Sequence, residues 1–223
     1  MLDCGEGKLH TKVNNFKRWA KANYPEVTEK NDNGEWCFCT EFYEMVSEAI
    51  RFMKKNSTEK ATQQVIDDLL YAIARDNEDC TIIEELEQYS EWFSLLCRCC
   101  LNTDYINAKW QFAEYLSGYR GDDDLQELIF EFLNAGDEYT ERLALKTLAD
   151  IHPEKAEKYA IDFWNRNKYA NDEYQKIMVL HVLYQIHSPQ LQHYLEMAKQ
   201  SQYEYVQYNA QEVIKKIKSE NHW

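Results

Sequence analysis

The densest group of reactive side chains in this sequence is a run of carboxylates between residues 121 and 131. Three aspartates are adjacent, and two glutamates follow at spacings of three and four residues. Such a run can coordinate a divalent cation, cap the N-terminus of a helix, or bind the lysines and arginines of a partner. The metal-binding interpretation, by analogy with aspartate-rich helices of enzymes that ionise prenyl diphosphates, requires a second metal motif that the sequence lacks.

Three adjacent acids exceed what one helix cap needs, so capping and partner binding are compatible interpretations of this run. We therefore predict a protein-binding surface and no metal site. The leading predicted contacts are Asp122, Asp123, Asp124, Glu127 and Glu131, and the further ones are Asp137, Glu138 and Trp164.

Cysteines form two short groups, Cys37 with Cys39, and Cys97 with Cys99 and Cys100. Zinc-binding pairs usually have two to four residues between the ligands, whereas Cys37/Cys39 and Cys97/Cys99 have one, and only Cys97 and Cys100 have two. On a helix, positions three apart share a face and positions two apart do not, which is typical of core packing. The odd total and the absence of a secretory signal favour reduced thiols in a cytoplasmic protein, with zinc binding as the alternative.

No grouping typical of catalysis accompanies these residues. His152 and His187 recur at one repeat distance, which would separate them by about 10 Å and favours a structural role at a turn. The sequence contains no Ser/His/Asp grouping, Gly-rich phosphate loop or His-Glu-x-x-His motif. We expect no catalytic residue and no cofactor.

The acidic excess is confined to the middle of the chain. Residues 1–60 contain 10 acidic and 10 basic side chains, and residues 151–223 contain nine of each, whereas residues 61–150 contain 20 and six. The net charge of −14 therefore arises in the central segment. Such a field attracts a basic partner and repels nucleic-acid phosphates.

Aromatic residues are abundant, with 16 Tyr, 9 Phe and 6 Trp. Tyrosines and tryptophans near carboxylates are typical of protein-binding faces, although a thin helical stack also exposes aromatic edges. Both interpretations stay open for Trp110, Tyr115, Trp164, Tyr169, Tyr203 and Tyr208.

Apolar residues recur at spacings of three and four along most of the chain, which predicts amphipathic helices. Expected helices contain the stripes 13–20, 42–53 and 61–73, with shorter helices at 82–89 and 92–101. Thr40 and Ser57 are expected N-caps, and residues 32–34 an expected turn. No apolar run reaches the length of about 18 residues that spans a bilayer.

A repeat begins near residue 105. The segment 139–151 matches 174–186 at an offset of 35 residues, and the register continues into the next turn. An earlier partial copy lies near residues 113–119, and a last half copy near 205–217. A helix pair cannot bury its apolar face alone, so repeated pairs stack on one another.

Residues 108–116 and 141–148 resemble the first helix of HEAT repeats, and the resemblance extends over about 105–217. It implies an all-α, right-handed stack of antiparallel helix pairs, a HEAT/ARM-like α-solenoid. It also implies that the second helices, at about 124–133, 154–164 and 189–198, line the concave side. We divide the chain into an N-terminal helical region, 1–102, and HEAT-like repeats, 103–223, and leave open whether the first region continues the solenoid.

These features predict a monomeric, cytoplasmic, non-enzymatic protein that binds a basic protein partner and neither nucleic acid nor membranes. The sharpest form is an immunity protein that neutralises a basic nuclease toxin in a heterodimeric complex. Two alternatives stay open, an enzyme like the HEAT-like DNA glycosylases and a generic scaffold module. A glycosylase needs a basic groove, whereas this chain is acidic in its middle.

Overall fold

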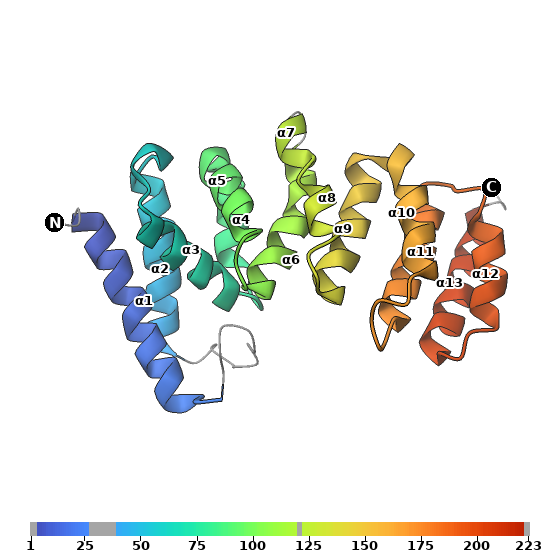
Figure 1. Cartoon of the computed structure of the whole chain (residues 1–223), viewed down its shortest axis with the longest axis horizontal. Coiled ribbons are helices and arrows are strands. Elements are labelled where there is room, and N and C mark those ends of the chain that lie inside the picture. Colours follow the sequence, from blue (N-terminus) through green and yellow to red (C-terminus); the bar gives the residue numbers. More distant parts are fainter. Residues whose placement is uncertain (1–3, 27–38, 120–121, 221–223) are drawn as a thin grey trace. The chain divides into compact units, whose positions relative to one another are not determined.

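The computed structural model describes residues 4–26, 39–119 and 122–220, and every regular element in these ranges is a helix (Figure 1). The turn expected at 32–34 and the thiol of Cys37 lie outside the described residues. The chain divides into two compact units, residues 1–131 and residues 132–223. The all-α fold class is confirmed.

The first unit is built around α3 (Gln63–Arg75), which packs on α1, α2, α4, α5 and α6. This helix is buried on several faces because apolar residues occupy nearly all of its last two turns, from Leu69 to Ala74. The other elements are α1 (Cys4–Asn23), α2 (Thr40–Lys55), η1 (Thr58–Lys60), α4 (Thr81–Leu86), α5 (Ser90–Cys100), α6 (Ile106–Tyr115), η2 (Leu116–Gly118), α7 (Asp123–Gln126) and α8 (Ile129–Phe132).

The second unit repeats one packing relation. Helix α9 packs on α10 and α11, and α11 packs in turn on α10, α12 and α13. Leu145 and Leu180, matched by the sequence repeat, are both fully buried, and so are Leu148 and Leu183. Burial of each such leucine contributes about 1.5–3 kcal/mol. The helices are α9 (Glu138–Ile151), α10 (Pro153–Asn165), α11 (Glu173–Gln185), α12 (Leu191–Lys199) and α13 (Glu204–Glu220).

Both predicted N-caps are wrong by one or more residues. Thr40 is the first residue of α2, and Cys39 precedes it without a side-chain cap. Ser57 precedes the short η1 turn, and Thr62 caps α3 instead by accepting a hydrogen bond from the Val65 amide at 3.3 Å. A two-residue separation between η1 and α3 leaves room for a second capping residue, which periodicity alone does not reveal.

The continuous helix expected at 124–133 is also wrong. The chain forms α7 and α8, separated by a turn at Glu127 and Leu128. Hydrogen bonds across three residues, as in a 3₁₀ turn, link the Leu128 amide to the Leu125 carbonyl and the Phe130 amide to the Glu127 carbonyl. This tightening lets Leu125, Ile129, Phe132 and Leu133 all be buried. The helices expected at 154–164 and 189–198 correspond to α10 and α12.

The domain boundary expected at 102/103 lies inside the first unit. Helix α6 begins at Ile106 and packs on α3, α4 and α5, so it belongs to the same core as the N-terminal helices. Within the described ranges, no helix combines the length and the apolarity that crossing a membrane requires.

Candidate protein-binding surface

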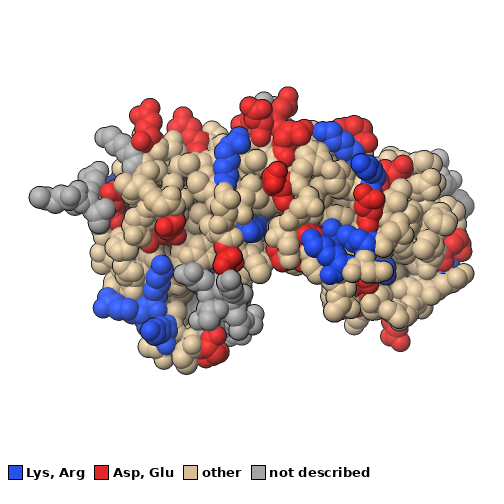
Figure 2. Space-filling view, in the orientation of Figure 1, with Lys and Arg blue, Asp and Glu red and all other residues tan. Residues whose placement is uncertain are grey.

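The predicted acidic contacts of the first unit lie on and beside α7 and are exposed to solvent (Figure 2). Asp122 caps this helix, and its Oδ1 accepts a hydrogen bond from the Leu125 amide at 3.0 Å. Asp123 and Asp124 lie in the first turn and form no ion pair with any residue that the structure describes. Helix capping therefore uses one carboxylate and leaves its neighbours open to solvent.

A second acidic cluster surrounds α4 and was not among the predicted contacts. Asp79, Glu84 and Glu87 are exposed there, and the Tyr115 hydroxyl donates a hydrogen bond to Glu84 Oε1 at 3.3 Å. Burial and the Glu84 carboxylate raise the pKa of Tyr115 to about 12. The density of acids between residues 76 and 87 is the sequence signal that could have identified this cluster.

One acid of this cluster is buried. Asp76 is 1 % exposed, and its Oδ2 accepts a hydrogen bond from the Ile82 amide at the start of α4, at 2.6 Å. Its Oδ1 is buried without a hydrogen-bond partner. Burial, together with Asp79 and Glu84, raises the pKa of this carboxyl to about 7. Asp76 is thus a structural residue behind the exposed acids.

The two units differ in charge. Residues 1–131 contain 26 acidic and 14 basic side chains, whereas residues 132–223 contain 13 and 11. Nearly the whole imbalance of −14 therefore belongs to the first unit. The central acidic segment 61–150 crosses the boundary between the units, so its last residues belong to the second unit. We call the exposed carboxylates around α4 and α7, which all lie in the first unit, the acidic surface.

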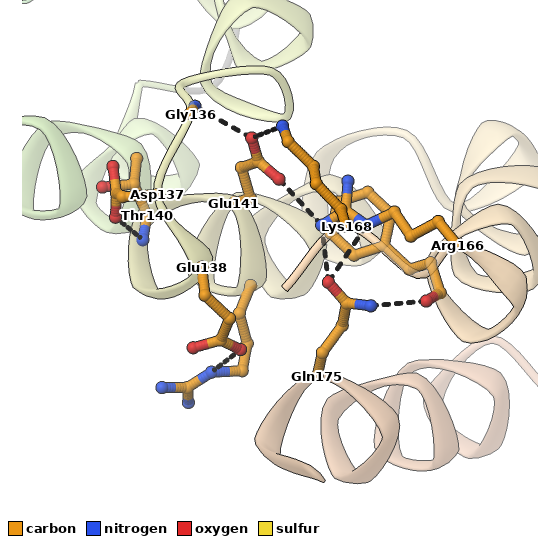
Figure 3. A network of polar contacts seen from close by, with 10 residues as sticks. Gly136, Asp137, Glu138, Thr140, Glu141, Arg166, Lys168 and Gln175 are labelled. Carbon is orange, nitrogen blue, oxygen red and sulfur yellow. Dashed lines mark hydrogen bonds and ion pairs between the residues drawn. The ribbon is translucent and has the colours of Figure 1, made fainter. Parts of the chain in front are cut away.

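The predicted contacts in the second unit are held by their own neighbours. Asp137 caps α9, and its Oδ1 accepts a hydrogen bond from the Thr140 amide at 2.8 Å. Glu138 Oε1 accepts one from Arg142 Nε at 2.9 Å (Figure 3). Burial raises the pKa of Glu138, and Arg142 opposes that rise. Both carboxylates are half-buried, so less of their charge is available to a partner.

Beneath them lies a fully buried carboxylate, Glu141, in an ion-pair network (Figure 3). Arg166 Nη2 lies 2.8 Å from its Oε2, and Lys168 Nζ lies 2.5 Å from its Oε1. The Gly136 amide also donates to Oε1 at 2.9 Å, at a φ of +92° that favours glycine.

Arg166 is itself held from a second side. Its Nε and Nη2 donate to Gln175 Oε1 at 3.0 and 2.6 Å, and its guanidinium lies 3.3 Å from the centre of the Phe163 ring. Removing Arg166 would leave the fully buried Glu141 carboxylate with only the partly exposed Lys168 as its cation, which destabilises the fold because a buried charge loses a partner. The network joins α9, the segment after α10, and α11.

Trp164 is buried, with 7 % of its surface exposed, and its ring packs edge-on against Tyr194 at 5.2 Å between centroids. Trp110 is buried too, whereas Tyr208 is 58 % exposed. The aromatic residues for which the sequence left both interpretations open are therefore divided between the core and the surface. The contact of Trp164 with a partner stays a prediction. Only the small exposed edge of its ring is available for such a contact.

The thiols of α5 are arranged as their spacing on a helix predicts. Cys97 and Cys100 are fully buried on one face of α5, and Cys99 is half-exposed. Burial raises the pKa of the Cys97 thiol well above its usual range. No three potential metal ligands of the His, Cys, Asp or Glu types converge among the residues that the structure describes.

No protein-family model matches this chain, and comparisons with curated proteins and with solved structures find no significant match.

Proposed function

We propose that the chain is a HEAT-like, right-handed stack of antiparallel helix pairs that binds a basic protein. The α-solenoid proposal is supported by the sequence repeat and by the packing of α9 on α11 and of α11 on α13. Because this packing joins the first helices of successive repeats, we infer that these helices, rather than the second ones, line the concave side of the second unit.

The observation that carries the binding proposal is the exposure of Asp123, Asp124 and Glu131 without an ion pair to any described residue, in a unit of 26 acidic and 14 basic side chains. Carboxylates held by the chain's own cations, as in the second unit, would not attract a partner. Solvated carboxylates of one sign steer an oppositely charged protein and accelerate its association.

The sharpest form of this proposal is an inhibitor of the immunity-protein type that neutralises a basic, nuclease-type toxin in the cytoplasm, as a monomer in a heterodimer. A nuclease is basic where it binds nucleic acid, so an acidic inhibitor can occupy the same surface. A scaffold role would use the same surface on another partner. The glycosylase alternative is less favoured because Arg142, Arg166 and Lys168 are paired with carboxylates rather than free to bind phosphates.

The test measures association of the purified chain with any basic protein encoded by a neighbouring gene, by stopped-flow fluorescence at about 20 mM salt. A neighbourhood that encodes no basic protein bound by this chain would contradict the immunity-protein form of the proposal. The double variant Asp123→Lys/Asp124→Lys should associate roughly tenfold more slowly, because it replaces two steering charges by charges of the opposite sign. The dissociation rate should change less.

The matched control is Glu154→Lys/Asp162→Lys, which makes the same change in net charge at two exposed carboxylates of α10. We expect this variant to associate at close to the wild-type rate. Equal rates for both double variants would remove the α7 surface from the interface. Duplex DNA binding at physiological salt would instead support the glycosylase alternative.

A further inference from the structure

Three exposed tyrosines occupy the same position in successive first helices of the second unit. Tyr139, Tyr174 and Tyr205 are each the second residue of α9, α11 and α13, and each follows a glutamate. Their side chains are 44 %, 53 % and 63 % exposed. Because α9 packs on α11 and α11 on α13, the three tyrosines stand at the start of neighbouring helices. We call these three side chains the tyrosine ladder, and each pair of successive tyrosines one step of it.

The first step of this ladder is already filled by a guanidinium of the chain itself. The Arg142 guanidinium carbon lies 4.8 Å from the centre of the Tyr139 ring and 5.4 Å from that of Tyr174. Its Nε donates to Glu138 at 2.9 Å (Figure 3). One arginine thus contacts two tyrosine rings and the glutamate that precedes the first of them.

The second step, between Tyr174 and Tyr205, has a tyrosine on each side and a glutamate before the first of them, as the first step has. Its central residue is different. The repeat offset of 35 residues that matches Tyr139 with Tyr174 matches Arg142 with Ile177, which is half-exposed. Glu173 corresponds to Glu138, and its carboxylate forms no ion pair with any residue that the structure describes. The next tyrosine, Tyr208, lies one turn after Tyr205 and is 58 % exposed.

We propose that the step formed by Tyr174, Ile177 and Tyr205 is a binding slot for an arginine side chain of a basic protein partner, with Glu173 accepting its hydrogen bonds. The Arg142 step of the same ladder provides the precedent for the geometry. The partner class rests on the proposed function, whereas the slot itself can be tested without the partner.

The chemistry of the slot favours a guanidinium over other ligands. A planar guanidinium stacks on aromatic rings and hydrogen-bonds a carboxylate at its edge, whereas an ammonium is a more strongly hydrated point charge. A phosphate or a carboxylate ligand would meet Glu173 and Glu204, which carry the same sign of charge. Lys176, the neighbouring cation, already pairs with Asp172 at 2.7 Å.

The test is an NMR titration of the full chain, carrying ¹³C-labelled tyrosine, with N-acetyl-arginine amide and separately with N-acetyl-lysine amide. We expect the arginine probe to shift the ring signals of Tyr174 and Tyr205 at roughly fivefold lower concentration than the lysine probe, since stacking contributes about 1 kcal/mol. Equal response to the two probes, or no shift at these rings, would refute the slot.

Two variants exchange the filled and open steps. In Ile177→Arg the new side chain should occupy the slot, so the arginine probe should no longer shift Tyr205. In Arg142→Ile the first step should open, so the probe should newly shift Tyr139 together with Tyr174. Circular dichroism checks that each variant folds, and Tyr205→Leu, which removes one wall at an exposed position, provides a second loss-of-binding variant.

The outcomes separate this inference from the proposed function. Asp123→Lys/Asp124→Lys should leave the titration unchanged, because those residues belong to the other unit. A normal titration without partner binding would contradict the proposed function alone. Two results would contradict the slot alone. In the first, the partner binds but the arginine probe causes no specific shift of the tyrosine signals. In the second, the Ile177→Arg variant binds the partner as strongly as the wild-type chain does.

Discussion

At the scale of single residues, Asp76 is a buried acid whose charge state changes near neutral pH. Its ordinary pKa is 3.8, and burial raises it to about 7 in the folded protein. Between these two values the folded protein holds a proton that the unfolded chain has released. Stability must therefore fall as the pH rises through this window, and the loss is complete once the pH exceeds the folded-state pKa.

We predict that Asp76→Asn removes this part of the pH dependence. Asparagine retains the oxygen that accepts from the Ile82 amide and never ionises. The wild-type free energy of unfolding should fall by about 1.4 kcal/mol per pH unit relative to the variant between about pH 5 and pH 7, which amounts to about 2–3 kcal/mol over that window. Urea unfolding at both pH values measures the difference.

Glu138 supplies the control, since its pKa is also raised but its carboxylate pairs with Arg142 at 2.9 Å. Glu138→Gln should change the pH dependence less than Asp76→Asn does. Parallel pH profiles for wild type and Asp76→Asn would show that the buried carboxyl stays ionised in the folded protein.

At the scale of elements, two histidines matched by the repeat end their helices differently. His152 follows α9 at φ −136°, and a single residue links that helix to Pro153 of α10. His187 follows α11 at φ +52°, in the left-handed region. The Ser188 amide donates to the Leu183 carbonyl at 2.9 Å, as in a helix C-terminus closed by a left-handed residue. The sequence repeat is thus not a repeat of turn conformation.

We predict that His187→Gly stabilises the protein by about 0.5–1 kcal/mol, because glycine adopts positive φ without the steric cost of a side chain. The equivalent change at the other turn, His152→Gly, should destabilise, since φ is negative there and glycine only adds freedom to the unfolded chain. Thermal unfolding of the two variants gives shifts of opposite sign if the turn conformations differ as described. Shifts of the same sign would contradict this assignment.

At the scale of the whole molecule, the proposed function implies that the distribution of charge sets how fast a basic partner associates. The first unit carries 26 acidic and 14 basic side chains, so its field extends beyond any single contact. The second unit is close to neutral, and its buried Glu141 is matched by Arg166 and Lys168. Under the proposed function, long-range attraction would therefore come from the first unit, whereas the tyrosines of the second would act only at contact distance.

We predict that association of the wild-type chain with its basic partner slows by roughly tenfold or more between about 20 and about 150 mM salt, because the screening length shortens to about 8 Å. Asp123→Lys/Asp124→Lys should show a shallower salt dependence than wild type. Stopped-flow rates across a salt series measure both slopes. A rate that is indifferent to salt would contradict steering by the acidic surface.

The sequence by itself determined the helical fold and much of its core. Spacings of three and four identified α2, α3 and α5, and the 35-residue repeat correctly matched Leu145 with Leu180 and Leu148 with Leu183. These features depend on local periodicity, which requires no knowledge of what packs against what. The exposure of Asp123 and Asp124 also follows from their residue type and their place in a first turn.

Only the tertiary structure decided where the units divide and which charges remain free. Contacts between helices place the division between the two compact units at 131/132, with α6 beside α3 in the first, and Arg166 and Lys168 reach Glu141 across 25 and 27 positions of the chain. The burial of Trp164 against Tyr194 likewise joins two helices. Composition and spacing specify how many charges and rings the chain has, but their partners depend on long-range packing, because a pair forms only where the folded backbone brings two side chains together.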